Sequence, residues 1–306
     1  MKIIFFGTTD FSLSIVQKIS EHYELLGAVI SKPRPKGRGL KVEIPEIGKW
    51  AMNKGIKIFD PENPNDPAFI QMLSELKPDL FVLSAYGHIL SNELLKVPKF
   101  GGINIHPSLL PKYRGAAPIQ RAIMAGEKIT GITIFFMDEK IDHGRILMKK
   151  ELAIYDNETY GSLSHRLALL GAEIIIDAIK NIETNNYTLI TQNETDITYA
   201  GKIKKEEMFI NWSDKSEKIH NLIRALSPNP GARTIFRNSE LIILEAELSD
   251  KKIEPGTFFI ENKKLYVGTG SGSIIIKMLK PENRRSITAQ DFINGFRIKT
   301  AERIDK

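Results

Sequence analysis

Apolar residues in the first part of the chain form short continuous runs separated by stretches with helical spacing. The runs at residues 2–6, 25–30 and 80–84 are apolar almost throughout, a pattern typical of buried strands in a parallel sheet. Between them, apolar side chains recur with helical period, as over residues 69–76, which predicts helices that pack on the sheet. Further strands are expected over residues 56–59, 102–106 and 132–136, and helices from residue 10 and over residues 47–53, 116–125 and 159–184. The alternation predicts an α/β fold, a doubly wound Rossmann-like domain.

The last hundred or so residues show a different pattern, in which short alternating segments are joined by turns that contain Gly or Asn. These segments are residues 232–237, 241–248, 257–261, 264–268 and 274–279. Short strands at this spacing indicate a small OB-like β-barrel, an architecture that often binds nucleic acid. Residues 185–206 are polar and irregular, so we expect a linker there, between a catalytic domain at 1–184 and a second domain at 207–306.

Composition is that of an ordinary globular protein of two domains, with 306 residues, 42% hydrophobic and 26% charged. No apolar run approaches the length of a membrane span, and the first residues read as a strand rather than a signal peptide. The chain has no cysteine, which excludes disulfides, thiolate metal sites and a cysteine nucleophile. The lack of cysteine fits a cytoplasmic protein, which we expect. The sequence also has no histidine-rich spacing typical of metal ligands, so we expect no bound metal.

Charge is distributed unevenly along the chain. Residues 1–200 carry 23 Lys and Arg against 23 Asp and Glu, whereas residues 201–306 carry 20 against 14, which accounts for the whole net charge of +6. A neutral first part and a basic last third suggest catalysis in one and a polyanionic partner on the other. The alternative is an ordinary solvated surface.

Two polar side chains lie two residues apart on the strand predicted over 102–106. Asn104 and His106 therefore point to the same side of the sheet, and Pro107 ends the strand directly after them. An amide donor beside an ionisable imidazole at the carboxyl end of a strand suits stabilisation of a developing oxyanion. An isolated Asn-x-His pair is more often structural, so the pair alone does not establish a site.

The residues around this pair form a long ordered motif. Residues 108–111 read SLLP and residues 113–119 read YRGAAPI. Near the N-terminus, residues 7–11 read GTTDF. Together with Asn104-x-His106, this run resembles the signature of the folate-dependent formyltransferases. Residues 142–144, Asp-His-Gly, are similar to an Asp-x-Gly that the family has after the next strand. His143 at its middle position is expected to point away from the site.

The resemblance implies three catalytic residues, Asn104, His106 and Asp142. Formyl transfer to an amine is acyl transfer, in which an oxygen becomes negative, the amine loses a proton and the leaving nitrogen gains one. Asn104 and a protonated His106 would donate to the oxygen, and Asp142 would support the imidazolium and accept the proton of the amine. No nucleophilic side chain or metal is needed.

The resemblance also implies the residues that contact the folate and the acceptor. Folate contacts are expected from Ser108, Leu109, Leu110 and Pro111 and from the strand-end loop at Tyr86 and Gly87. Residues 31–41 hold five basic residues, two prolines and two glycines, and predict a mobile loop without regular structure. In the family the matching loop enters the acceptor end of tRNA, which implies RNA contacts from Arg38, with Lys36 and Lys41 beside it. The simpler interpretation is a solubilising surface loop.

The activity that the resemblance implies is transfer of a formyl group from 10-formyltetrahydrofolate to the α-amine of methionine esterified to initiator tRNA. We expect the chain to act as a monomer. Three alternatives remain open at this point: the same chemistry on a small amine such as an amino sugar, transfer of the formyl group to water, and a non-catalytic RNA-binding protein.

Overall fold

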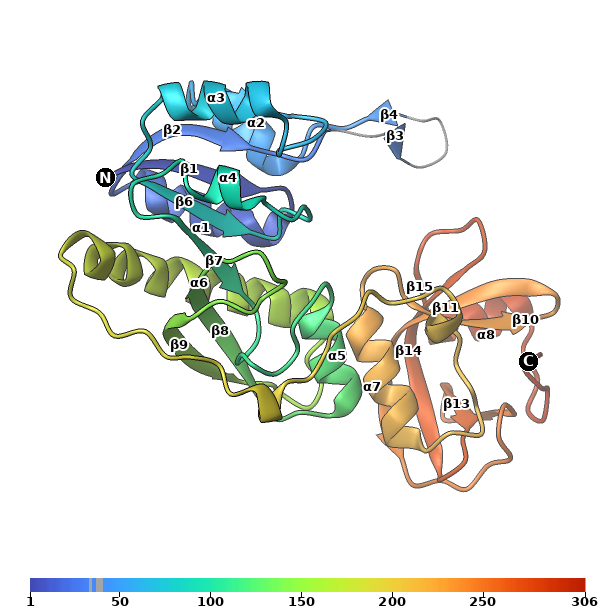
Figure 1. Cartoon of the computed structure of the whole chain (residues 1–306). Coiled ribbons are helices and arrows are strands. Elements are labelled where there is room, and N and C mark those ends of the chain that lie inside the picture. Colours follow the sequence, from blue (N-terminus) through green and yellow to red (C-terminus); the bar gives the residue numbers. More distant parts are fainter. Residues whose placement is uncertain (33–34, 37–40, 306) are drawn as a thin grey trace. The chain divides into compact units, whose positions relative to one another are not determined.

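The structure is a computed structural model that describes residues 1–32, 35–36 and 41–305 (Figure 1). Contacts within the chain divide it into two compact units. Unit 1 comprises Met1–Pro118, Ile129–Ala153 and Ser164–Gly201, and unit 2 comprises Ile119–Lys128, Ile154–Leu163 and Lys202–Lys306. Two short segments from within the first two hundred residues therefore pack with the C-terminal part of the chain.

The described residues of unit 1 form a seven-stranded sheet in the order β5-β2-β1-β6-β7-β8-β9. Its strands are β1 (Lys2–Gly7), β2 (Glu24–Val29), β5 (Ile58–Phe59), β6 (Leu80–Ser84), β7 (Gly102–His106), β8 (Ile129–Phe136) and β9 (Ile146–Ala153). The pairs from β5 to β7 are parallel, and β8 and β9 are added antiparallel. The predicted α/β fold with a Rossmann-like parallel core is confirmed.

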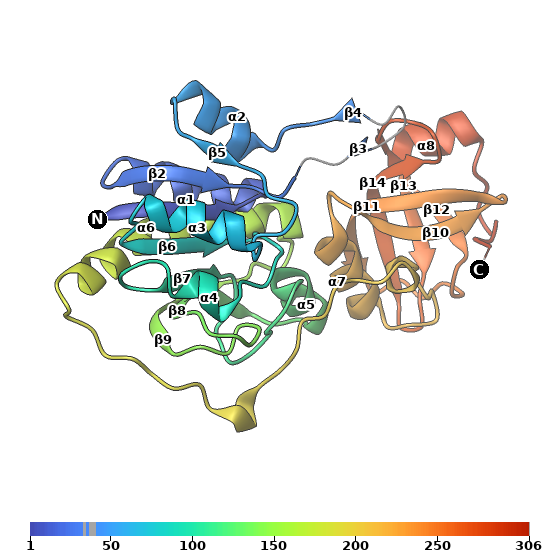
Figure 2. The same cartoon turned by 45° about the horizontal axis from the view of Figure 1, so that its top comes forward.

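Helices cover both faces of this sheet (Figure 2). They are α1 (Asp10–Ser20), α2 (Glu46–Asn53), α3 (Pro67–Glu75), α4 (Asn92–Leu95) and α6 (Tyr160–Glu183). On one face, Ile4 and Phe6 of β1 join an apolar cluster with residues of α3 and α4. On the other face, α6 packs closely, and a Cβ on its Gly171 would lie 3.3 Å from side-chain atoms of Ile15 in α1 and Ile105 in β7. Because successive side chains of a strand point to opposite faces, the same strands contribute apolar residues to the helices on both sides.

Some elements differ from the sequence prediction. The basic loop was expected to lack regular structure, but β3 (Pro35–Lys36) pairs antiparallel with β4 (Lys41–Val42). The two strands form a sheet of their own, in which each is an edge strand, and an edge strand tolerates proline. Strand β9 was not predicted because it is an edge strand interrupted by the consecutive exposed residues Lys149, Lys150 and Glu151, so its apolar pattern is weak.

In the described part of unit 2, six strands pair antiparallel in one sheet, confirming the predicted barrel-like β-domain. They are β10 (Ala232–Phe236), β11 (Ser239–Ser249), β12 (Phe258–Glu261), β13 (Lys264–Gly268), β14 (Ser273–Pro281) and β15 (Ile287–Thr288). The path ends at β10 and β12, and the C-terminal segment connects these two edges through bridges Ile235–Asp305 and Thr257–Arg303. Inside, the rings of Phe236, Phe258 and Phe292 pack edge to face.

Helix α7 (Ser216–Leu226) anchors one of the earlier segments to unit 2. The buried guanidinium of Arg224 donates through Nη1 to the carbonyls of Tyr155 (3.2 Å) and Glu158 (2.9 Å). The Gly161 amide donates to the Ser227 carbonyl at 3.1 Å. The other segment contains most of α5 (Pro118–Ala125), whose Met124 packs against the apolar core of this unit. Short helix α8 (Ala289–Phe296), which was not predicted, contributes Phe292 to the same core.

Candidate active site

Strand β7, an interior strand of the sheet, carries the predicted pair. Asn104 lies opposite Leu83 of parallel β6 and Phe135 of antiparallel β8, and His106 lies opposite Thr133. The His106 ring is buried with 5% of its side chain exposed. Because side chains alternate along a strand, the two polar groups leave the sheet on the same side, as the sequence predicted.

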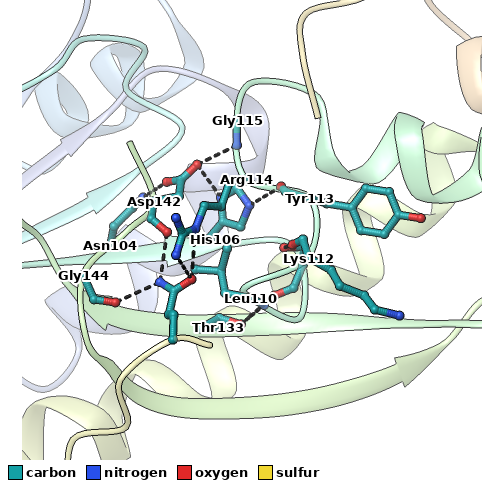
Figure 3. Close-up of polar contacts among 12 residues, drawn as sticks. Asn104, His106, Leu110, Lys112, Tyr113, Arg114, Gly115, Thr133, Asp142 and Gly144 are labelled. Carbon is teal, nitrogen blue, oxygen red and sulfur yellow. Dashed lines mark hydrogen bonds and ion pairs between the residues drawn. The ribbon is translucent and has the colours of Figure 1, made fainter. Parts of the chain in front are cut away.

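The His106 ring is oriented from both ends (Figure 3). Its Nε2 lies 2.9 Å from the carbonyl oxygen of Tyr113. A carbonyl oxygen only accepts, so Nε2 carries the hydrogen of this bond. Nδ1 then faces Oδ2 of Asp142 at 3.6 Å. The ring therefore presents Nδ1 to the carboxylate in either protonation state.

The Asp142 carboxylate contacts both Asn104 on β7 and the loop that follows β7 (Figure 3). Its Oδ1 accepts from Nδ2 of Asn104 at 3.4 Å, and its Oδ2 accepts from the Gly115 amide at 2.8 Å. Asp142 adopts a left-handed backbone with φ of 49°, which is uncommon for a residue with a side chain. The structure thus brings Asn104, His106 and Asp142 to one place, although Asp142 is far from the other two in sequence.

Two buried polar side chains behind the Asp142 turn were not among the predicted site residues. Gln192 donates through Nε2 to the carbonyls of Asp142 (2.9 Å) and Gly144 (2.8 Å). Arg114 donates to Oε1 of Gln192 through Nε (3.1 Å) and Nη2 (2.8 Å). Arg114 stands in the YRGAAPI run, but Gln192 lies in the segment expected to be a linker, where one buried glutamine gives no sequence signal.

His143 points away from the other three residues. Its Nδ1 lies 2.6 Å from Oδ2 of Asp138, and its Nε2 lies 3.4 Å from Oε1 of Glu194. These contacts agree with the expectation that the middle residue of Asp-His-Gly faces elsewhere.

The four residues predicted to contact folate form a tightly hydrogen-bonded loop after β7. Ser108 donates to the Lys112 carbonyl at 2.6 Å, and Thr133 bonds both the Ser108 carbonyl (2.6 Å) and the Leu110 amide (3.1 Å). The side chain of Leu110 is fully buried against Phe135 and Ile146. Leu109 and Pro111 are partly exposed, so these two can offer side-chain surface to a ligand.

Of the two residues predicted to contact folate in the loop after β6, Tyr86 is buried and Gly87 is exposed. The ring of Tyr86 packs edge to face on Phe6, with ring centres 5.4 Å apart, and burial raises the pKa of its hydroxyl to about 12. Gly87, with φ of 85°, is exposed at the loop's outer side. Tyr86 thus serves packing, and Gly87 is the accessible member.

The residues predicted to contact RNA can be followed only in part. Arg38 lies outside the described residues. Lys36 and Lys41 are paired with each other across β3 and β4. Within the part of the chain that the structure describes, no helix has the length and apolar character of a membrane span, and no three His, Cys, Asp or Glu side chains are grouped to bind a metal ion.

Comparison with known families gives matches over nearly the whole chain. A model of the formyl transferase family matches residues 1–179, and a model of the formyl transferase C-terminal domain matches residues 202–297. The chain is 38% identical to methionyl-tRNA formyltransferase of Dictyoglomus thermophilum, with 100% of both chains covered. It is 40% identical to methionyl-tRNA formyltransferase of Thermodesulfovibrio yellowstonii, covering 97% of this chain and 96% of that one.

Solved structures share the fold at lower sequence identity. HypX from Aquifex aeolicus in complex with tetrahydrofolic acid superposes with a TM-score of 0.69 at 17% identity, covering 100% of this chain and 51% of that one. An N-formyltransferase from Helicobacter canadensis, in complex with folinic acid and dTDP-3-aminofucose, gives a TM-score of 0.70 at 22% identity, covering 90% and 98%.

Proposed function

The chain belongs to the formyl transferase family, and on that premise we propose that it transfers a formyl group from 10-formyltetrahydrofolate to the α-amine of methionyl-tRNA for translation initiation. The choice of these two substrates rests on sequence identity of 38% to 40% with methionyl-tRNA formyltransferases over nearly complete chains. The reaction class is supported independently by the grouping of an amide, an imidazole and a carboxylate, the groups that acyl transfer to an amine requires.

Asn104 supplies the donor for the formyl oxygen, which becomes negative when the amine attacks. One of its two N–H groups lies toward Asp142 at 3.4 Å, a long contact that costs little to give up, and the second is available to substrate. A well-placed donor of this kind lowers the barrier by about 2.7–4 kcal/mol.

His106 and Asp142 handle the proton. The hydrogen on Nε2 is held by the Tyr113 carbonyl, so the nitrogen that exchanges a proton is Nδ1, which faces the carboxylate. Asp142 stabilises the imidazolium by its charge, and it accepts the proton of the attacking ammonium directly or through water. The attacking ammonium loses two protons in all, so one is passed to the leaving folate nitrogen and the other is released to solvent.

Substrate contacts are assigned to residues around this centre. We assign folate contacts to the loop of Ser108, Leu109, Leu110 and Pro111, with side-chain surface from Leu109 and Pro111. We also assign a contact to Gly87, whose own loop is held to the core by Tyr86. Contacts with tRNA are assigned to Arg38, Lys36 and Lys41 and to the basic residues of the C-terminal part. The three central groups come from one chain, so no second copy is needed to complete the site, and we propose a monomer that acts on charged tRNA in the cytoplasm.

The deciding experiment is transfer of radiolabelled formyl from 10-formyltetrahydrofolate to methionyl initiator tRNA. Label on the tRNA supports the proposal. Release of formate without an acceptor would identify transfer to water, and label on an amino sugar but not on tRNA would identify a small-amine enzyme. Binding of tRNA with no loss of formyl folate would identify a non-catalytic protein.

A further inference from the structure

We propose that Gln192, fixed in orientation by Arg114, is a positioning residue that holds the Asp142 carboxylate in its working place beside His106. The proposal rests on the proposed function, because it assigns a role in the proton transfer that Asp142 performs. It also gives the segment around residue 192 a part in the active site, although the sequence predicted only a linker there.

The first support is that Gln192 uses both hydrogens of its amide on the Asp142 turn. Nε2 lies 2.9 Å from the Asp142 carbonyl and 2.8 Å from the Gly144 carbonyl. Two bonds from one nitrogen to these two carbonyls fix the peptide planes that follow Asp142 and Gly144. A turn held this way cannot rotate without losing both bonds at a buried site.

Arg114 decides which way the Gln192 amide points. Its Nε and Nη2 both donate to Oε1 of Gln192, at 3.1 and 2.8 Å. A guanidinium only donates, so the amide oxygen must face Arg114 and the nitrogen must face the two carbonyls. Both side chains are about 95% buried, with 4% and 5% exposed, so water does not compete for these bonds.

The turn needs such a hold, because its backbone is not in a relaxed conformation. Asp142 has φ of 49°, a conformation that costs about 1 kcal/mol or more for a residue other than glycine. On the other side of the turn, a Cβ on Gly144 would lie 1.7 Å from the Phe136 carbonyl oxygen, so the turn is pressed against the end of β8. Without the Gln192 bonds, Asp142 can relax toward a right-handed backbone.

Relaxation of that backbone would move the carboxylate. Its present place is fixed by the Gly115 amide at 2.8 Å and leaves Oδ2 3.6 Å from Nδ1 of His106. Misplacement by an ångström at a proton-transfer site costs about two orders of magnitude in rate. Gln192 therefore acts on the reaction through Asp142, without touching a substrate.

The test uses Gln192→Glu in the full-length protein. Glutamate keeps the size of the side chain and pairs with Arg114, so the unit should stay folded, but its carboxylate cannot donate to the two carbonyls. We expect kcat for formyl transfer to fall about 10–100-fold, while KM for folate and tRNA changes less than about 3-fold. Gln71→Glu, the same change at an exposed position of α3, is the matched control and should leave kcat unchanged.

A double-mutant cycle separates positioning from a structural effect. If Gln192 acts through Asp142, adding Gln192→Glu to Asp142→Ala should lower the residual rate less than about 2-fold, since the group to be positioned is gone. Full additivity, or a wild-type kcat in the single variant, would overturn the proposal.

Deuterium exchange over residues 138–146 provides a readout without activity, because it reports opening of the Asp142 turn. Gln192→Glu should accelerate exchange there if the turn loosens, and unchanged exchange would count against the proposal. An inactive wild-type protein would refute the proposed function instead, and the exchange result would still stand.

Discussion

Oδ2 of Asp142 lies 3.6 Å from Nδ1 of His106, and 11% of the Asp142 side chain and 5% of the His106 side chain are exposed. The distance is long for a hydrogen bond but within the range of an ion pair, and such contacts often shorten only when substrate is bound. Since Nε2 is already committed to the Tyr113 carbonyl, Nδ1 is the nitrogen left for proton exchange.

Removal of any of the three central groups should abolish most activity without unfolding the protein. We expect Asn104→Ala, His106→Ala and Asp142→Ala each to lower kcat by at least about 100-fold, because each removes an oxyanion donor or a proton carrier. Combined losses should fall well short of the product, since the groups act as a unit. Single-turnover formylation and circular dichroism provide the measurements, and near-normal turnover in one variant would remove that residue from the mechanism.

Gly115→Ala should impair both stability and catalysis. Gly115 has φ of 122°, and a Cβ there would lie 2.8 Å from the Ala200 carbonyl oxygen, so the backbone must shift. The same shift would pull its amide from Asp142. We expect a loss of about 1–3 kcal/mol in the free energy of unfolding and a fall in kcat of more than about 10-fold.

The control for this substitution is Gly201→Ala. Its added methyl group would meet no heavy atom within 4 Å, and its φ is not in the left-handed region. It should change stability by less than about 0.5 kcal/mol in urea unfolding. Equal effects of the two substitutions would contradict the steric argument.

Arg38→Ala should damage the reaction with tRNA and spare the reaction with a small amine. A loop contacted by the acceptor end orients the amine for attack, so kcat with methionyl-tRNA should fall along with a rise in KM. Slow formylation of a small amine is the internal control. If both reactions suffer equally, the loop belongs to the folate site.

The ionised carboxylate of Glu207 should stabilise unit 2 at neutral pH, and this stabilisation should be lost in acid. Its carboxylate accepts from Arg121 at 2.6 and 3.0 Å, and these bonds, with a further one from the Lys204 amide, lower its pKa to about 2 from 4.5. A lowered pKa stabilises the native state above pH 4.5, and this contribution is lost as pH falls toward 2. With 37% of the side chain exposed, solvent screening limits the effect to about 0.5–1 kcal/mol.

Urea unfolding checks this pH dependence. Glu207→Gln should lower the free energy of unfolding at neutral pH, and its difference from wild type should shrink steadily below pH 4.5. Glu206→Gln, an exposed neighbour, should show no such trend. A difference that stays constant with pH would mean that the charge of Glu207 does not stabilise the fold.

The sequence was sufficient for the parts of the fold whose apolar pattern is strong. Buried strands such as β6 and the long helix α6 follow directly from periodicity, and Asn104 and His106 share a face because side chains alternate along a strand. The link to Asp142 came from the family resemblance, because no local pattern indicates which loop returns to a strand end.

What escaped prediction depends on contacts between distant residues. Strand β9 was missed because its lysines face solvent at an edge, and its pairing with β8 decides its structure. Gln192 was missed because a glutamine in a polar stretch looks solvated, and only the buried guanidinium of Arg114 shows otherwise. The packing of the Tyr86 ring on Phe6 likewise joins residues that are distant in sequence.

The division of the chain between its units sets a limit on recombination within the family. Residues 119–128 and 154–163 pack with residues 202–306, and the Arg224 guanidinium is bonded to carbonyls of the second of these segments. A chimaera that exchanges only the part after residue 201 would pair Arg224 with foreign backbone at positions 155 and 158. Crossovers that transfer all three segments together keep inherited contacts intact, so the two halves of this enzyme are not interchangeable at a single joint.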